Sequence, residues 1–433
     1  MATRIRRRGN PGSGRNSDAK LWGIGAAAVA LVTAGGIVVS LATGTGHPVK
    51  GQADSVAASA APTAAPRGRT VDGVPVGHPR TEAGAKAAGQ NYVTERGTVA
   101  FLTNTAARHR AVSVMSAVSA KSNALKESDR LASQAAGDLR GDNPKVLPAQ
   151  SIARTGVLAN HVLGFDIHKA TLRLWTTTVR GSSAGHAAPK SAFESVTVTL
   201  VWEGDDWKLL TTSATGGLVA PVDKRQATNV TADFSEYVPS SAADPIASGT
   251  LDAAEMPAPY LRTEHGARAA ATSAVALYGD SRFFIDTAWR DRMLAATASP
   301  DVLAQVSADA TAAAQMVSSN RGLGGDGRTV DGGLLVTRTA TLGTRSVAYT
   351  DQTASIELWT ASLGGIAGAD ETQRPQVAFL RMTVDLTWRD GTWKTTSVTP
   401  SEPLVPSPAT ATQATPGTAF AEMGGAANAP ALA

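Results

Sequence analysis

The sequence predicts an α+β protein with an N-terminal transmembrane helix and two tandem modules, in each of which helices pack on one face of an antiparallel sheet. Three observations predict it. A stretch of 26 residues near the N-terminus carries no charge. Farther along, the chain repeats itself at an offset of 182 to 186 residues, which indicates a duplicated unit. Within each copy, the spacing of apolar residues changes from a helical pattern to the alternation typical of strands.

The uncharged stretch, 21–46, follows a basic tail, 1–20, that holds six basic residues and one acidic residue. As a helix, Trp22–Ala42 would be about 30 Å long, which matches the hydrocarbon thickness of a bilayer. Because basic residues stay on the cytoplasmic side, we expect a single-pass protein of the cell membrane with a cytoplasmic N-terminus and extracytoplasmic modules. A cleaved signal peptide is the alternative, since Ser40–Gly46 is rich in small residues.

Composition excludes several function classes. The chain of 433 residues has a net charge of +4, of which the tail supplies +5, so the remainder sums to about −1. Nucleic-acid binding through bulk charge is therefore not expected. Cysteine is absent, which excludes disulfides, thiolate metal sites and cysteine nucleophiles.

The domain boundaries follow from composition and from the repeat. We expect a Pro/Ala-rich linker at 47–79, because it has too few large apolar residues to form a core. The two modules should occupy 80–221 and 259–400, with an inter-module linker at 222–258. The remainder, 401–433, has a composition like that of the first linker and should be a disordered tail.

The repeat is seen in three blocks of sequence. Arg80–Ala88 (RTEAGAKAA) returns as Arg262–Ala270 (RTEHGARAA). Gln150–Thr176 aligns without gaps on Leu334–Thr360. In the third block two tryptophans recur with the same spacing. Small loop insertions explain the drift of the offset, so one duplicated module accounts for all three blocks.

The tryptophan block in the first copy reads TLVWEGDDWKLLTT and places carboxylates between the tryptophans. The pairs are Trp202 with Trp207 and Trp388 with Trp393. In the second copy, Glu203 is replaced by Arg389 and Asp206 by Thr392. We therefore interpret the block as a hairpin turn with packed tryptophans and with Glu203, Asp205 and Asp206 solvated at its tip, and not as an acid/base or metal site.

Each copy begins with helices and ends with strands. Thr81 and Thr263 are expected to cap the first helix. The segments that follow, near 101–136 and 283–320, fit one or two helices. In the last part, alternating apolar residues predict strands with one apolar face. They include Leu172, Leu174, Val196, Val198 and Leu200 in the first copy and Met382, Val384 and Leu386 in the second.

This order of elements resembles the nuclear transport factor 2-like fold, a cone of helices on a curved antiparallel sheet. A basic tail, one membrane span, a linker and two such modules further resemble the bitopic transfer proteins of Gram-positive conjugation systems, which are similar to the scaffold subunit of type IV secretion machines. The resemblance is one of architecture over roughly residues 15–400. It implies a non-enzymatic scaffold with the membrane and protein subunits of an envelope complex as partners, homo-oligomerisation and no cofactor.

Alternative functions stay open. An accessory protein of an actinobacterial lipid-import system would have similar anchored modules. A small-ligand sensor or an isomerase-like enzyme would instead use one cone as a pocket. An enzyme needs an acid and a base on the helix-facing side of the sheet, but Asp166 aligns with Thr350 and Arg173 with Glu357.

Other motifs give no site. The run Gly322–Thr329 (GLGGDGRT) differs from a phosphate-binding loop by Arg328 and lies between a predicted helix and a predicted strand, the reverse of the required order. The histidines form no metal-binding pair; they are at positions 47, 78, 109, 161, 168, 186 and 265. We name no catalytic, cofactor-binding or metal-binding residue.

Basic residues that occur in both copies have an ordinary structural explanation. The pairs are Arg154 with Arg338 and Lys208 with Lys394. We expect their stems to pack on the sheet while their charged tips stay in water.

Overall fold

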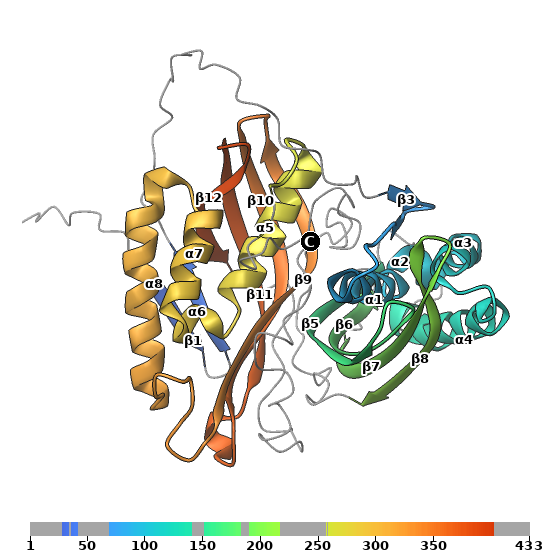
Figure 1. Ribbon diagram of the computed structural model, residues 1–433, viewed down its shortest axis with the longest axis horizontal. Coiled ribbons are helices and arrows are strands. Elements are labelled where there is room, and N and C mark those ends of the chain that lie inside the picture. Colours follow the sequence, from blue (N-terminus) through green and yellow to red (C-terminus); the bar gives the residue numbers. More distant parts are fainter. Residues whose placement is uncertain are drawn as a thin grey trace, which may run out of the picture.

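The computed structural model describes residues 28–33, 36–41, 69–140, 151–182, 190–216, 257 and 259–401. They form two α+β modules with the same order of helices and strands (Figure 1). Module 1 consists of α1 (Glu82–Arg96), α2 (Val99–Thr103), α3 (Thr105–Met115), α4 (Lys121–Arg140), β5 (Ser151–Phe165), β6 (Lys169–Ser182), β7 (Lys190–Glu203) and β8 (Asp206–Gly216). Its strands pair antiparallel in the order β5-β6-β7-β8.

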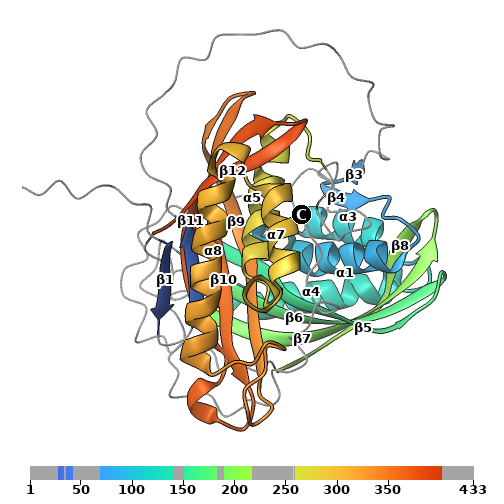
Figure 2. The same cartoon turned by 60° about the vertical axis from the view of Figure 1, so that its left-hand side comes forward.

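Module 2 repeats this arrangement with antiparallel strands in the order β9-β10-β11-β12. Its elements are α5 (Glu264–Tyr278), α6 (Arg282–Ile285), α7 (Thr287–Thr297), α8 (Pro300–Arg321), β9 (Leu334–Tyr349), β10 (Thr353–Ala367), a 3-10 turn (Glu371–Gln373), β11 (Gln376–Arg389) and β12 (Thr392–Ser401). In Figure 2, α5, α7 and α8 lie in front of this sheet. The α+β class with antiparallel sheets is thus confirmed.

The helices begin where side chains can cap them. The hydroxyls of Thr81 and Thr263 accept hydrogen bonds from the backbone of Gly84 and Gly266, as the sequence predicted. The following segment forms three helices instead of one or two. Asn104 ends α2 and its side chain caps α3 by accepting a hydrogen bond from Ala107, because asparagine competes for backbone groups and favours a new N-terminus.

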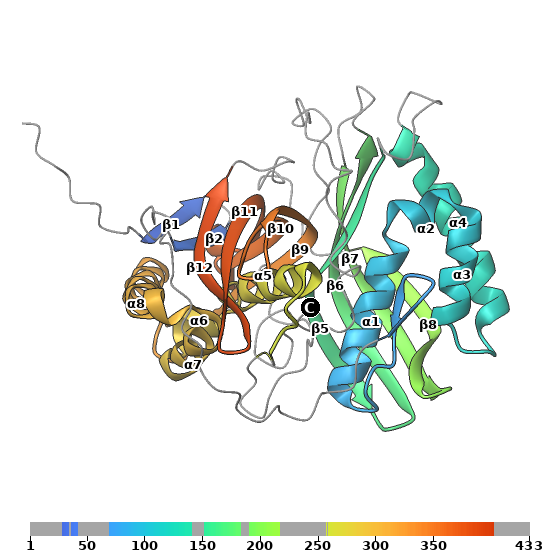
Figure 3. The same cartoon turned by 90° about the horizontal axis from the view of Figure 1, so that it is seen from above.

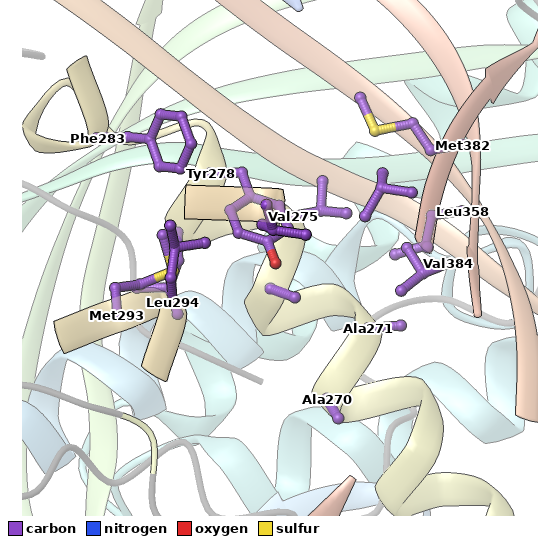
Figure 4. Close-up of a cluster of buried hydrophobic side chains, with 14 of the residues drawn as sticks. Ala270, Ala271, Val275, Tyr278, Phe283, Met293, Leu294, Leu358, Met382 and Val384 are labelled. Atoms are coloured by element: carbon purple, nitrogen blue, oxygen red, sulfur yellow. The ribbon is translucent and has the colours of Figure 1, made fainter. Parts of the chain in front are cut away.

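One face of each sheet packs against the helices. In module 2, Val275 and Ala271 of α5 face Leu358 of β10 and Val384 of β11 (Figure 4). In module 1 the equivalent core contains Leu172, Leu174, Val196, Val198 and Leu200. The alternation predicted from the sequence therefore identifies the helix-facing side of both sheets.

The opposite faces are apolar too, which corrects the prediction of one apolar face. There the two modules pack on each other, with β5 against β9. Equivalent residues of the two copies share this inter-module core: Ile152 with Val336, Leu158 with Leu342, Trp175 with Trp359, Val179 with Leu363 and Phe193 with Phe379. At Gly156 a Cβ atom would lie 3.1 Å from both the Ala340 Cβ and a methyl of Leu342, so glycine permits the close approach of the strands.

The sequence predicts a transmembrane helix at 21–46, but the described residues of this segment form strands. Ala28–Thr33 (β1) and Gly36–Leu41 (β2) form an antiparallel hairpin. β2 packs against α8, β10, β11 and β12 (Figure 3). Valine, isoleucine and threonine are β-branched and favour strands over helices, which explains why this segment forms a hairpin. Among the described residues, no helix has the length and hydropathy needed to cross a membrane.

The first linker is shorter than predicted. Arg69–Val71 (β3) and Val74–Val76 (β4) pair as a hairpin that packs on α1 and α3, with Val74 fully buried. Asp72 and Gly73 have φ values of 51° and 82°, which a tight hairpin turn requires and which this residue pair favours. The predicted tail at 1–20, residues 217–256 of the inter-module region and residues 402–433 lie outside the described residues.

Candidate functional site

The tryptophan block is a structural clasp in both modules. Gly204 and Asp205 form the turn between β7 and β8, and Trp202 and Trp207 pair across the strands with ring centroids 5.4 Å apart. The indole nitrogen of Trp207 donates to the carbonyl of Pro79 at 2.9 Å. The turn therefore holds the chain that enters α1.

Module 2 has the same clasp. Its indole donor is Trp393, which bonds the carbonyl of Leu261 at 2.9 Å. An arginine lies over the outer tryptophan of each pair: Arg80 is 5.3 Å from Trp202 and Arg262 is 5.5 Å from Trp388. The repetition of every contact indicates a role in folding.

Asp206 contradicts the prediction of a solvated turn tip, since it is 3 % exposed. One of its oxygens accepts hydrogen bonds at 3.0 Å from the backbone N–H of His78 and from the His78 ring, and the other accepts from Lys208 at 3.2 Å. Burial acts to raise the pKa of Asp206, but the bond and charge of His78 and the charge of Lys208 lower it overall. The partner His78 follows the hairpin that composition had assigned to a linker.

The lysines that follow the tryptophans are also not solvated at their tips. Lys208 donates to the carbonyl of Val114 at 2.9 Å, near the C-terminus of α3. Lys394 donates to the carbonyls of Ala295 and Ala296 near the C-terminus of α7. A cation at this end of a helix satisfies free carbonyls and complements the helix dipole, which explains why both copies carry lysine.

The arginine pair Arg154 and Arg338 is buried as well, at 8 % and 1 % exposure. Burial lowers the pKa of Arg154 to about 10. In module 2, Arg338 lies 3.3 Å from a carboxylate oxygen of Asp280, and Arg282 lies 3.1 Å from the other. Asp280, Arg282 and Arg338 therefore form a buried charge cluster. The side chains of Arg154 and Arg338 are both buried, so neither has the solvated tip that we expected.

The acid and base candidates do not meet on the helix-facing side. Asp166 is exposed in the turn before β6 and accepts hydrogen bonds from the backbone of His168 and Lys169. Glu357 is bound by Arg345 at 2.9 Å and lies 3.9 Å from Arg381. Along β10 it alternates with Leu358, so it projects to the inter-module side of the sheet.

A cavity of about 350 Å³ opens in module 1 between α3, α4 and β8. We call it the module 1 groove. Val112, Met115 and Leu209 provide apolar walls. The polar lining includes Arg96, Ser119, Asn123, Glu127, Ser128 and Thr212. A partly apolar concavity with a few polar groups is the typical form of a binding site.

Arg96 is, with Glu127, one of the two charged groups that line the groove. It donates to the hydroxyl of Thr212 at 2.7 Å. Burial lowers its pKa, while the charge of Glu127 acts in the opposite direction. Comparing the two copies for shared charged residues did not identify Arg96, because its counterpart in module 2 is Tyr278. A charge present in one copy only is a signal that a comparison of shared residues discards.

Glu95, next to Arg96 on α1, predicts a pH dependence of stability. Burial raises the pKa of this carboxyl from 4.5 to about 7. The penalty for ionising it in the folded state is absent below pH 4.5 and grows as the pH rises to 7. We expect Glu95→Leu, which copies Leu277 of module 2, to stabilise module 1 by about 3 kcal/mol at pH 8 and to have little effect at pH 4.

Urea unfolding followed by tryptophan fluorescence at both pH values measures this difference. Glu82→Gln in the first turn of α1 is the control, since Glu82 is exposed. An equal effect of Glu95→Leu at both pH values would contradict the prediction.

The remaining motifs form no further site. No group of three or more metal-binding side chains occurs within the part of the chain that the structure describes; His47 and His186 lie outside it. Gly322 ends α8 in the left-handed conformation at φ 63°, so the glycine-rich run follows a helix and lacks the geometry of a phosphate-binding loop. No family model, curated protein or solved structure matches the chain.

Proposed function

We propose that the protein is a non-enzymatic, membrane-anchored scaffold whose two modules form one binding body on the extracytoplasmic side. The observation that supports this most directly is the inter-module core. It joins the two sheets and leaves the helices α2–α4 and α6–α8 at opposite ends of the body (Figure 3). A single body with two outward helical surfaces can hold two partners close to each other.

The anchor in this proposal is the apolar segment 21–46, preceded by the basic tail. The architectural resemblance favours an envelope complex of the conjugation or type IV secretion kind, with its protein subunits as partners. The buried charges of the modules support a scaffold over an enzyme: Asp206, Asp280 and Glu357 are each engaged by basic side chains, which is how structural carboxylates are stabilised.

The module 1 groove is the surface on which the proposal can be tested. Asn123 lines it and is exposed, whereas the adjacent Ser122 is exposed and does not line it. The full chain would be isolated from membranes of its own host in mild detergent, and co-purifying subunits would be quantified by mass spectrometry. Asn123→Arg is expected to reduce partner recovery about tenfold, as loss of a central contact does, while Ser122→Arg should leave it unchanged.

Membrane association must stay the same in both variants, because the substitutions lie far from the anchor in sequence. The scaffold function would be refuted if no envelope subunit were enriched with the unaltered chain. Equal losses for Asn123→Arg and Ser122→Arg would show that the groove is not the binding surface.

A second function, binding of a small amphipathic ligand, is favoured by the size of the groove and by Arg96 at its wall. Cavities of about 300–1,000 Å³ are typical of small-molecule sites. Native mass spectrometry of the purified chain would detect such a ligand as an added mass that Asn123→Arg removes. If the spectrum shows no added mass while partner recovery is intact, the ligand-binding function is refuted and only the scaffold function remains.

A further inference from the structure

The two modules differ in how their longest helix meets the sheet. In module 1, α4 packs directly on β5 and β6. In module 2, α8 packs on α6, α7 and the hairpin β1–β2, and the hairpin in turn packs on β10, β11 and β12. Figure 3 shows the two strands between α8 and the sheet. The apolar strands β1 and β2 thus occupy the space between α8 and the strands β10–β12, which we call the module 2 cone.

The burial of α8 agrees with this arrangement. Val306, Asp309 and Ala313 form a buried edge, at 4 %, 9 % and 3 % exposure. Their counterparts on α4, at the offset of 182, are Ala124, Glu127 and Leu131, which are exposed or partly exposed. Two of those counterparts, Ala124 and Glu127, line the open module 1 groove. The same wall is therefore open in one module and covered in the other.

The strand side shows the same contrast. Val398 of β12 is 2 % exposed, whereas its counterpart Thr212 on β8 lines the module 1 groove. Apolar residues are thus present in module 2 where module 1 has polar ones: Val398 replaces Thr212, and Ala310 of α8 replaces Ser128 of α4. At these two positions the wall of module 2 is more apolar than the equivalent wall of module 1.

We propose that the module 2 cone is a receptor for the chain's own apolar strands β1 and β2, residues 28–33 and 36–41. Off the membrane, the cone shields this segment from water; when the segment enters a bilayer, the space between α8 and β10–β12 opens to solvent. The proposal rests on the membrane anchoring proposed above. Lipid and a protein core are similarly apolar, so transfer between them costs little compared with exposure to water.

The connecting chain is long enough for both positions. Residues 42–68 separate β2 from β3, and 27 extended residues span at most about 90 Å. An emptied cone would therefore stay within reach of the membrane surface, as an apolar site that exists only in the anchored protein.

The absence of cysteine allows a direct test with single thiols in the full chain. Ala313→Cys places a thiol on the buried edge of α8. Ala132→Cys on α4 is the control, because Ala132 is 7 % exposed and lies on a helix that packs directly on its own sheet. Each variant would be synthesised in a cell-free system without lipid or with vesicles of phosphatidylethanolamine and phosphatidylglycerol, and its reaction with a membrane-impermeant maleimide would be timed.

We expect the thiol of Ala313→Cys to react about tenfold faster in the protein that floats with vesicles than in the lipid-free protein, and the thiol of Ala132→Cys to react slowly in both. Flotation measures anchoring and the thiol measures the cone, so the two proposals fail separately. If the chain floats and the thiol of Ala313→Cys stays protected, the receptor proposal is overturned while anchoring stands.

A second variant tests the cone without a membrane. Val38→Glu introduces a charge into a strand that has protein on both sides, which the cone should not tolerate. In the lipid-free chain this substitution is expected to accelerate labelling of Ala313→Cys about tenfold, with slow labelling of Ala132→Cys as evidence that the modules remain folded. Unchanged protection of the thiol would overturn the proposal even if the chain never floats.

Discussion

Replacing Asp280 by asparagine is expected to lower the free energy of unfolding of module 2 by about 3–5 kcal/mol, because it removes the carboxylate shared by two guanidinium groups. Asp280 is 3 % exposed and Arg338 is 1 % exposed. Their charged atoms are 3.3 Å apart, and Arg282 approaches the same carboxylate at 3.1 Å. Burial already lowers the pKa of Arg338, and the charge of Asp280 counteracts that shift.

Urea unfolding followed by tryptophan fluorescence measures this change, since each module contains its own tryptophan pair. The double variant Asp280→Asn with Arg338→Met is the informative control. It removes the carboxylate together with one buried cation, so it should recover part of the lost stability. A loss below about 1 kcal/mol in the single variant would show that the cluster is hydrated and not buried.

Local signals in the sequence predicted the elements well. The caps at Thr81 and Thr263 and the alternation along β7 and β11 depend on residues a few positions apart, so a short window contains the whole interaction. The duplication strengthened both predictions, because the same pattern occurred twice. The tryptophan turn was correctly interpreted as a hairpin for the same reason.

Contacts between distant segments could not be predicted in this way. Asp206 is buried because His78 lies against it, 128 residues earlier in the chain, and composition had assigned His78 to a linker. The dipeptide Asp72-Gly73 between two valines is a hairpin signal. It was not used, because the composition of 47–79 favoured a linker. The second apolar face of each sheet followed from packing between modules, which a strand pattern of one module does not contain.

For a related reason, comparing the sequences of the two copies did not predict the module 1 groove. Residues shared by both copies turned out to be structural, such as Lys208 with Lys394 at the helix ends. The groove instead depends on differences between the copies, such as Arg96 against Tyr278. In a duplicated protein, shared residues therefore identify the scaffold of the fold, and divergent residues at equivalent positions identify where the two copies were specialised.

The clasp itself gives the second large effect. Trp207 is fully buried, packs edge-on against Trp202 and lies 5.9 Å from the Phe165 ring, while its carbonyl accepts a hydrogen bond from the Tyr92 hydroxyl. Trp207→Ala is expected to destabilise module 1 by about 3–5 kcal/mol, since it leaves a cavity and removes the donor to Pro79.

Trp393→Ala makes the matched change in module 2, where Trp393 is 2 % exposed. Each substitution should lower the denaturant midpoint of its own module more than that of the other module. Any shift in the midpoint of the other module measures the coupling through the inter-module core. Trp207→Phe keeps most of the apolar volume and loses only the indole donor, so it should cost about 1–2 kcal/mol. If Trp207→Phe were as destabilising as Trp207→Ala, the hydrogen bond to Pro79 and not the packing would hold the clasp together.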